Sequence, residues 1–225
     1  MQLYVHIDLN EPLVLPINYN HIIQAIIYKT LSVMPNYSEF LHERGYASGT
    51  RQYKMFQFSQ LKGEYKIIDK KIIFYSAVEF EIRSPEPLLI HLLNGGFIYE
   101  GITFGEKQYR KIRTKIDDFT VEDQAISVQM KTPIVVYSTD PVTKYTDYYS
   151  PIDQEFYEGI QQNAYNKYTA YYGVEPDSYI EIQKIQNSVA KKMVTKYQGH
   201  YIIAWYGEYI CLLYTSDAAD DLIGV

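Results

Sequence analysis

The sequence has almost no cysteine and no apolar run long enough to cross a membrane. Its 225 residues include one cysteine, Cys211, so neither an internal disulfide nor a thiolate metal site is expected. No hydrophobic stretch reaches the roughly 18 residues that span a bilayer, and the start lacks the basic head and apolar core of a secretory signal. These absences predict a cytoplasmic protein that does not bind membranes.

Metal-binding and nucleotide-binding motifs are also missing. The five histidines are scattered, and no H-x3-H pair, HExxH motif or DxD carboxylate cluster occurs. The glycine patterns of P-loops and dinucleotide-binding folds are absent, as is the GxSxG nucleophile elbow. We therefore expect no catalytic metal and no cofactor.

Tyrosine is abundant, with 25 of 225 residues, and supplies flat rings suited both to sheets and to base stacking. The formal net charge of −6 by itself argues against a nucleic-acid partner. However, residues 1–120 carry 14 Lys+Arg against 13 Asp+Glu, so the acidic excess lies in the rest of the chain. The charge of the first half does not exclude nucleic acid.

The first half shows the order strand, helix, strands, helix, strand. Residues 2–9 alternate apolar and polar side chains as in a half-buried strand, and helical spacing follows over 22–34 until Pro35. A polar loop over 38–52 leads to strand-like segments between 54 and 84. A second helix is predicted from Ser84-Pro85 to Gly95-Gly96, before a last strand over 105–116. This order is the split βαβ, ferredoxin-like arrangement.

The second half begins the same order again and breaks off before its last helix and strand. We therefore predict an α+β protein of two tandem ferredoxin-like (βαββαβ) domains, residues 1–120 and 121–210, of which the second is incomplete. The segment 211–225, CLLYTSDAADDLIGV, has no amphipathic period and resembles translated vector or adapter DNA. It is expected to be a non-native tail, and the alternative is a natural frayed terminus.

The segment 38–54 holds the best candidates for chemistry. His42 can exchange a proton near neutral pH, and Arg51 and Lys54 could neutralise a phosphate. Cleavage of RNA without a metal needs such groups: a base for the 2′-hydroxyl, a cation for the crowded phosphorane and an acid for the leaving 5′-oxygen. The alternative is a solvated loop with an incidental histidine.

Tyr28 is a candidate because of its place on the first predicted helix. The apolar stripe over 22–34 covers half of that helix, and Tyr28 falls nearly opposite the centre of the stripe, beside His21 and Gln24. Core packing therefore does not require it. The alternative is an ordinary surface tyrosine.

The strand predicted over 105–116 carries the clearest electrostatic pattern. Alternation puts five residues on one of its faces: Lys107, Tyr109, Lys111, Arg113 and Lys115. Like charges crowded on one face repel each other, so the pattern calls for a polyanion such as an RNA backbone, or for acidic partners on neighbouring strands.

These segments, in this order, resemble the CRISPR-associated endoribonuclease family of the RAMP superfamily, which cuts precursor CRISPR RNA within each repeat. The resemblance covers most of residues 1–210. The segments that carry it are LPINYNHIIQAIIYKTL, SEFLHERGY with the following YKMFQFSQLKG, KTPIVVYS and GHYIIAWYGEYI. That family has two ferredoxin-like domains in tandem.

The resemblance implies metal-independent transesterification, in which the 2′-hydroxyl attacks the adjacent phosphate and leaves a cyclic 2′,3′-phosphate and a 5′-hydroxyl. His42 would take the position of the family's catalytic histidine, Tyr28 that of its helix tyrosine, and Lys54 that of the cation, with Arg51 as the substitute. The implied partners are CRISPR repeat RNA and other subunits of a CRISPR effector complex. The protein itself would be a monomer or a homodimer.

One departure is the glycine-rich loop that the family carries near its C-terminus, because beyond Gly199 this chain has only Gly207 and Gly224. The departure points to a truncated second domain, for which we expect poor stability or aggregation. Two other functions stay open: a noncatalytic RNA-binding subunit of a CRISPR effector complex, and a ferredoxin-like protein with a small-molecule partner.

Overall fold

The computed structural model describes residues 1–118, 120–185, 188–197 and 199–215, and the chain divides into two compact units, 1–120 and 121–225. The first unit contains the strands β1 (Gln2–Asp8), β2 (Leu13–Pro16), β3 (Tyr46–Ser48), β4 (Arg51–Tyr53), β5 (Gln57–Phe58), β6 (Tyr65–Ile68), β7 (Lys71–Phe74), β8 (Ala77–Arg83), β9 (Ile102–Phe104), β10 (Lys107–Tyr109) and β11 (Ile112–Asp117). Its helices are α1 (Asn20–Leu31), α2 (Pro35–Glu39), the π-helical turn η1 (Phe40–Arg44) and α3 (Pro87–Glu100).

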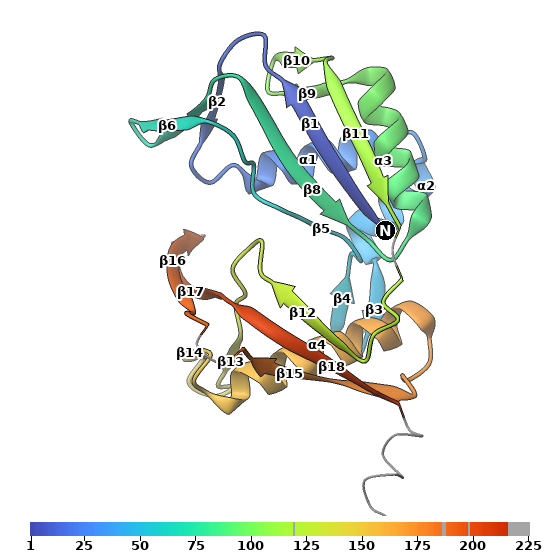
Figure 1. Cartoon of the computed structure of the whole chain (residues 1–225), viewed down its shortest axis with the longest axis vertical. Helices are drawn as coiled ribbons and strands as arrows, with labels where there is room; N and C mark the ends of the chain where they lie inside the picture. Colours follow the sequence, from blue (N-terminus) through green and yellow to red (C-terminus); the bar gives the residue numbers. More distant parts are fainter. Residues whose placement is uncertain (119, 186–187, 198, 216–225) are drawn as a thin grey trace, which may run out of the picture. The chain divides into compact units, whose positions relative to one another are not determined.

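The main sheet of the first unit has the strand order β11-β1-β8-β5, with every neighbouring pair antiparallel. These are the fourth, first, third and second strands of a βαββαβ unit, with α1 and α3 as its two helices (Figure 1). Alternation along β1 buries Leu3, Val5 and Ile7 in the core with the helices, whereas Tyr4 and His6 lie on the opposite face. The predicted ferredoxin-like fold is confirmed.

Helix α3 runs through Gly95-Gly96, where the sequence pattern predicted its end. The reason is the close packing of α3 on α1: a Cβ at Gly96 would lie 2.3 Å from the Thr30 side chain, so glycine permits the approach. The helix ends instead at Gly101, whose φ of +81° lies in the range that favours glycine.

The second unit contains β12 (Ala125–Gln129), β13 (Tyr137–Thr139), β14 (Thr146–Tyr148), α4 (Gln154–Tyr172), β15 (Ser178–Lys184), β16 (Lys191–Tyr197), β17 (His200–Tyr206) and β18 (Glu208–Thr215). Its three-stranded sheet has the antiparallel order β12-β18-β15, which matches the first, third and second strands of a βαββαβ unit. Helix α4 contacts β15, and fully buried Phe156 of α4 packs against Tyr209 of β18.

Strand β18 begins directly after Gly207, which separates it from β17. β18 then continues through residues 211–215, because β12 and β15 pair with it on both sides, and Cys211 lies opposite Ile126 and Ile182. The first five residues of the expected tail are therefore part of the sheet, and residues 216–225 lie outside the described residues.

Within the described ranges, no helix combines the length and the apolarity that crossing a bilayer requires.

Candidate functional site

The segment that holds His42 is helical, which corrects the polar loop expected over 38–52. After α1 the chain forms α2 and then the π-helical turn η1. Leu41 is fully buried, and the Gly45 amide donates to the Phe40 carbonyl at 2.6 Å and closes the wide turn. Single π-helical turns are rare and occur frequently at functional sites. This one anchors itself in the core through Leu41 and leaves the imidazole of His42 exposed.

Gly45 allows the chain after β4 to lie close to this turn. Its φ is +65°, and a Cβ there would lie 2.5 Å from the Tyr53 carbonyl oxygen, so the backbones meet only because the side chain is absent. Lys54 follows Tyr53 directly and extends its ammonium to the His42 carbonyl, to which it donates a hydrogen bond at 2.8 Å. The hairpin thus brings the predicted cation to the predicted histidine.

Tyr28 meets His42 from α1. The two ring centroids are 4.9 Å apart and the ring planes are inclined by 79°, an edge-to-face contact. The tyrosine ring is partly buried and also packs edge-to-face on Phe56. Burial raises the pKa of Tyr28, and a hydrogen bond with Gln24 opposes that shift. The phenol therefore keeps its proton at neutral pH and can act as a donor beside the imidazole.

Glu43 holds one side of the imidazole. Its Oε1 lies 2.6 Å from Nδ1 of His42, and both side chains are well exposed. Because the carboxylate engages Nδ1, Nε2 is the ring nitrogen left to exchange a proton with a substrate.

Arg51, the proposed substitute cation, lies elsewhere on the same hairpin. It begins β4, opposite Ser48 and next to the turn, and its side chain is exposed. Among the described residues, no hydrogen bond or ion pair joins Arg51 to His42. Of the four candidates, the structure thus brings Tyr28, His42 and Lys54 together and leaves Arg51 at the end of the hairpin.

The strand predicted over 105–116 is two strands, and this corrects the single basic face. β10 pairs with β9 in a small hairpin, whereas β11 pairs with β1 in the main sheet. Tyr109 ends β10 and is 2% exposed within the hydrophobic core, where burial raises the pKa of its phenol. It therefore does not share a solvent face with the lysines, because residues 110 and 111 interrupt the strand alternation.

Three of the basic residues predicted on this face, Lys107, Arg113 and Lys115, have partners within the first unit. Lys107 pairs with Glu11 at 3.0 Å and donates to the Pro12 carbonyl. Arg113 donates to both carboxylate oxygens of Asp8, at 2.9 and 3.2 Å. The ammonium of Lys115 lies 5.8 Å from the centroid of the Tyr4 ring, and Lys111 is exposed between β10 and β11.

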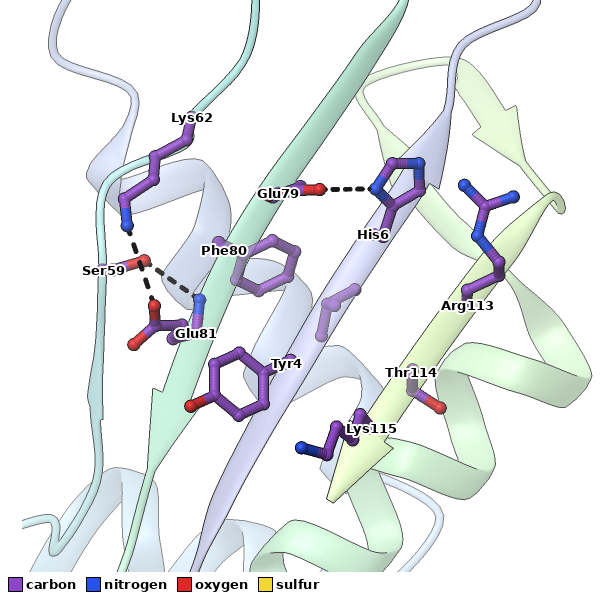
Figure 2. Close-up of a pocket in the computed structure, with 11 residues that line it drawn as sticks. Tyr4, His6, Ser59, Lys62, Glu79, Phe80, Glu81, Arg113, Thr114 and Lys115 are labelled. Atoms are coloured by element: carbon purple, nitrogen blue, oxygen red, sulfur yellow. Dashed lines mark hydrogen bonds and ion pairs between the residues drawn. The ribbon is translucent and has the colours of Figure 1, made fainter. Parts of the chain in front are cut away.

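A pocket of about 280 Å³ opens on this face of the main sheet, and Arg113 and Lys115 line it. Figure 2 shows it bounded by β1, β8, β11 and the chain after β5. Its other polar or aromatic lining residues are Tyr4, His6, Ser59, Lys62, Glu79, Phe80, Glu81 and Thr114. Lys62 pairs with Glu81 at 3.7 Å, so cations and carboxylates are interleaved around the pocket.

His6 is held between two carboxylates at this pocket. Nδ1 lies 2.7 Å from Oε1 of Glu79, and Nε2 lies 3.0 Å from Oδ1 of Asp8. The hydrogen bond to Glu79 is the main reason why the pKa of His6 is raised, with Asp8 adding to it and burial and Arg113 opposing it. The pKa of Asp8 is lowered, first by His6 and then by Arg113.

The sequence did not single out Tyr4, His6 or Glu79. Their signal was the alternation of residues 2–9, which puts Tyr4 and His6 on the face opposite the core. Their cross-strand partners could not be identified, because the register with β8 and β11 depends on contacts more than 70 residues apart in the chain, as in the pairs His6↔Glu79 and His6↔Arg113. Among the described residues, no group of three or more His, Cys, Asp and Glu side chains could hold a metal ion.

The second half of the chain is similar to a known family. Residues 114–217 match the family model described as CRISPR associated protein Cas6, C-terminal. The match reaches past residue 210 and through the end of β18. No curated protein sequence matches the chain.

Solved structures share the fold over nearly the whole chain. A structure described as CRISPR associated protein Cas6 is 21% identical, covers 98% of this chain and 90% of its own, and has a TM-score of 0.69. A Cas6-related protein from Pyrococcus furiosus is 16% identical, with 97% and 89% covered and a TM-score of 0.72. A RAMP protein described as binding different RNA substrates is 19% identical, with 98% and 90% covered and a TM-score of 0.68.

Proposed function

This chain is a CRISPR-associated protein of the Cas6 family, and from this premise we propose that it cleaves CRISPR repeat RNA without a metal ion. The family generally consists of endoribonucleases that process CRISPR RNA. In the proposed reaction the 2′-hydroxyl attacks the adjacent phosphate, the bond from phosphorus to the 5′-oxygen breaks, and the products carry a cyclic 2′,3′-phosphate and a 5′-hydroxyl. The mature guide RNA that results would serve antiviral defence.

The observation that carries the proposal is the meeting of Tyr28, His42 and Lys54. They come from α1, η1 and the segment after β4, which are separate in sequence. Each supplies a group that the reaction needs: His42 exchanges a proton, Tyr28 is a hydrogen-bond donor, and Lys54 is the cation. Two contacts support this grouping: the edge-to-face contact of the Tyr28 and His42 rings, and the hydrogen bond from Lys54 to the main-chain carbonyl of His42.

The proton inventory suggests a division of roles. Nε2 of His42 takes the proton of the attacking 2′-hydroxyl, with Glu43 holding the ring through Nδ1. Tyr28 is protonated when the substrate binds, because burial raises its pKa, and it gives its proton to the leaving 5′-oxygen as the bond from phosphorus breaks. The proton that His42 has taken from the 2′-hydroxyl then returns to the phenol, so both side chains regain their starting state. Lys54 has three N–H groups and uses one on the His42 carbonyl, so the others can face the charge that develops on the phosphate.

The test is single-turnover cleavage of a labelled CRISPR repeat RNA in EDTA. His42→Ala should lower the cleavage rate by roughly 10²-fold or more, with little change in the Kd for the RNA. His21→Ala is the matched control, since His21 is also exposed and lies on α1 with Tyr28. It should cleave as fast as the unchanged protein.

The products and the salt dependence distinguish the alternatives. A single cut that leaves a cyclic phosphate agrees with the proposal. RNA binding that weakens with salt but is never followed by a cut would overturn it in favour of a noncatalytic RNA-binding subunit. The absence of any salt-sensitive RNA binding would leave the third function, a small-molecule partner.

A further inference from the structure

A buried polar segment, residues 84–86, joins the two parts of the chain that carry the proposed cleavage groups. It connects the end of β8 to the start of α3. His42 lies in η1 directly after α2, and Lys54 follows β4. Ser84 and Glu86 are each only 5% exposed, so their side chains bond within the protein. Each of them reaches one of the two parts.

Ser84 holds the residue that follows Lys54. Its hydroxyl donates a hydrogen bond to the carbonyl of Met55 at 2.8 Å. If the antiparallel register of β5 with β8 is continued past its last pair, Met55 lies opposite Pro85. Proline has no N–H to donate. The Ser84 hydroxyl therefore supplies the hydrogen bond that the main chain of the sheet cannot make at this point.

Met55 has an unusual backbone conformation. Its φ is +54°, in the left-handed region that favours glycine, and its side chain is buried. Such a conformation persists only where the surrounding structure fixes it, and it occurs often at functional sites. Because Lys54 directly precedes Met55, the same backbone sets where the Lys54 side chain begins. The Lys54 ammonium then reaches the His42 carbonyl at 2.8 Å.

Glu86 holds the helix that leads into η1. The hydroxyl of Tyr37 in α2 donates a hydrogen bond to Oε2 of Glu86, and the Glu86 N–H donates to Oγ of Ser84 at 3.0 Å. Glu86 directly precedes α3, but its side chain makes no capping hydrogen bond to that helix. The carboxylate therefore does not serve the end of α3, and its printed partner lies on the segment that carries His42.

We propose that Ser84 and Glu86 are positioning residues for the cleavage site. Ser84 fixes the segment that carries Lys54, and Glu86 acts through Tyr37 on the turn that carries His42. Both side chains are buried, so they act on these groups and not on the RNA. The proposal rests on the proposed function, because it assigns the two residues to the same reaction. Misplacing a reacting group by about 1 Å can lower a rate roughly 10²-fold.

Single-turnover cleavage of repeat RNA at saturating protein tests Ser84. Ser84→Ala should lower the cleavage rate by roughly 10- to 100-fold with an unchanged Kd, and Ser84→Thr, which keeps the hydroxyl, should recover most of it. Ser59→Ala is the matched control. Ser59 is equally buried, donates to the Gln60 carbonyl at 3.0 Å and accepts from the Glu81 N–H at 2.9 Å. A rate in Ser84→Ala no lower than in Ser59→Ala would overturn the proposal.

A double-mutant cycle separates positioning from a general loss of folding. If Ser84 acts through Lys54, the protein with both Ser84→Ala and Lys54→Ala should cut about as slowly as Lys54→Ala alone. A rate reduced by the product of the two single effects would mean that Ser84 does not act through Lys54, and this part of the proposal would be wrong.

Tyr37→Phe tests Glu86 and removes only one hydroxyl from a partly buried ring, so it should fold even if Ser84→Ala does not. The Gly45 amide closes η1 on the Phe40 carbonyl. Its hydrogen exchange should become roughly 10-fold faster or more, the effect of losing a hydrogen bond to a charged group, and cleavage should slow. Tyr157→Phe in α4 is the control, since that hydroxyl also donates to an acceptor, the Pro151 carbonyl, at 2.8 Å.

Amide exchange does not depend on cleavage, so failure of this proposal and failure of the proposed function can be told apart. If the unchanged protein cuts repeat RNA while Ser84→Ala and Tyr37→Phe behave like their controls, the positioning proposal falls and the endoribonuclease stands. If repeat RNA is never cut but Tyr37→Phe speeds exchange at Gly45, the endoribonuclease falls and the effect of Glu86 on η1 stands.

Discussion

At the scale of single residues, His6 gives the first unit a stability that depends on pH. Its pKa in the folded protein is raised above the ordinary value of 6.5 by Glu79 and Asp8. A group whose pKa rises on folding stabilises the folded state fully below its unfolded pKa and loses that effect as pH rises through the folded value. We expect the contribution to fade above about pH 6.5 and to stay below about 1 kcal/mol, because both carboxylates are partly exposed.

Urea unfolding at several pH values checks this prediction. His6→Gln should flatten the decline in the free energy of unfolding between mildly acidic and mildly alkaline pH. His91→Gln, at an exposed histidine of α3, is the control and should keep the decline. If the free energy of unfolding falls equally with pH in the unchanged protein and in His6→Gln, the hydrogen bonds of His6 with Glu79 and Asp8 do not contribute to the pH dependence.

Tyr28 permits a test that separates chemistry from packing. Tyr28→Phe keeps the ring that packs on Phe56 and His42, so the free energy of unfolding should change little. Loss of the hydroxyl removes a donor, and the cleavage rate should fall about 10²-fold with unchanged RNA affinity. Tyr99→Phe, far more exposed, should be silent in the same single-turnover assay. A cleavage rate within about twofold of the unchanged protein would remove Tyr28 from the proposed mechanism.

The residue scale also shows where a periodic pattern is incomplete. The apolar stripe over 22–34 predicted Tyr28 outside the core, but the structure has it partly buried, packed against the edge of the core and beside His42. Tyr109 shows a second limit. Its face depended on an uninterrupted strand, and a break at residues 110 and 111 reversed the outcome. Period-2 reasoning holds within a strand and fails across a break that tertiary packing sets.

At the scale of elements, the π-helical turn η1 could not be predicted from local sequence. The many polar residues in 38–52 are typical of a loop, and within η1 only Leu41 occupies a buried position. Its burial depends on α1 and the main sheet, which supply the core around it. The separation of β10 from β11 has the same origin, since each pairs with a different partner strand.

Gly45 and Gly49 give a matched pair for testing this element. Both have positive φ, at +65° and +58°, but a Cβ would meet the Tyr53 carbonyl oxygen at 2.5 Å only at Gly45, and nothing within 4 Å at Gly49. Gly49→Ala should cost about 1 kcal/mol, the price of the left-handed conformation alone. Gly45→Ala should cost more, about 2–4 kcal/mol, and should also slow cleavage, because Lys54 and His42 move apart.

Urea unfolding and single-turnover cleavage of both variants measure these effects. Equal losses of stability in the two variants would mean that the backbones can separate without cost. A full cleavage rate in Gly45→Ala would contradict the role of this close approach in positioning Lys54.

At the scale of the whole molecule, the order of elements was predictable and the pairing partly so. The succession of strands and helices in residues 1–120 predicts a βαββαβ unit, and the order β11-β1-β8-β5 follows from that topology. Of the strand-like segments expected between 54 and 84, the first is reduced to β5, the short edge strand that pairs with β8. The extension of β18 through residues 211–215 was missed, because its stability comes from two partner strands and not from its own pattern.

The two units have cores of different size, which predicts that they open at different free energies. In the described residues the core cluster of the second unit has three buried members, Phe156, Ile182 and Tyr209, whereas that of the first unit spans the main sheet and both helices. Since stability follows buried apolar area, the second unit should lose its amide protection first in hydrogen exchange of the full chain.

Two substitutions at fully buried phenylalanines test this difference. Phe156→Ala in α4 and Phe97→Ala in α3 each remove a side chain that is 0% exposed, at a cost of about 3–5 kcal/mol. Phe156→Ala should speed exchange in β12, β15 and β18 and leave β1, β8 and β11 protected. Phe97→Ala should speed exchange in β1, β8 and β11. Equal acceleration of both units by either change would instead mean that the chain unfolds as one cooperative body, because neither core could then lose its packing without the other.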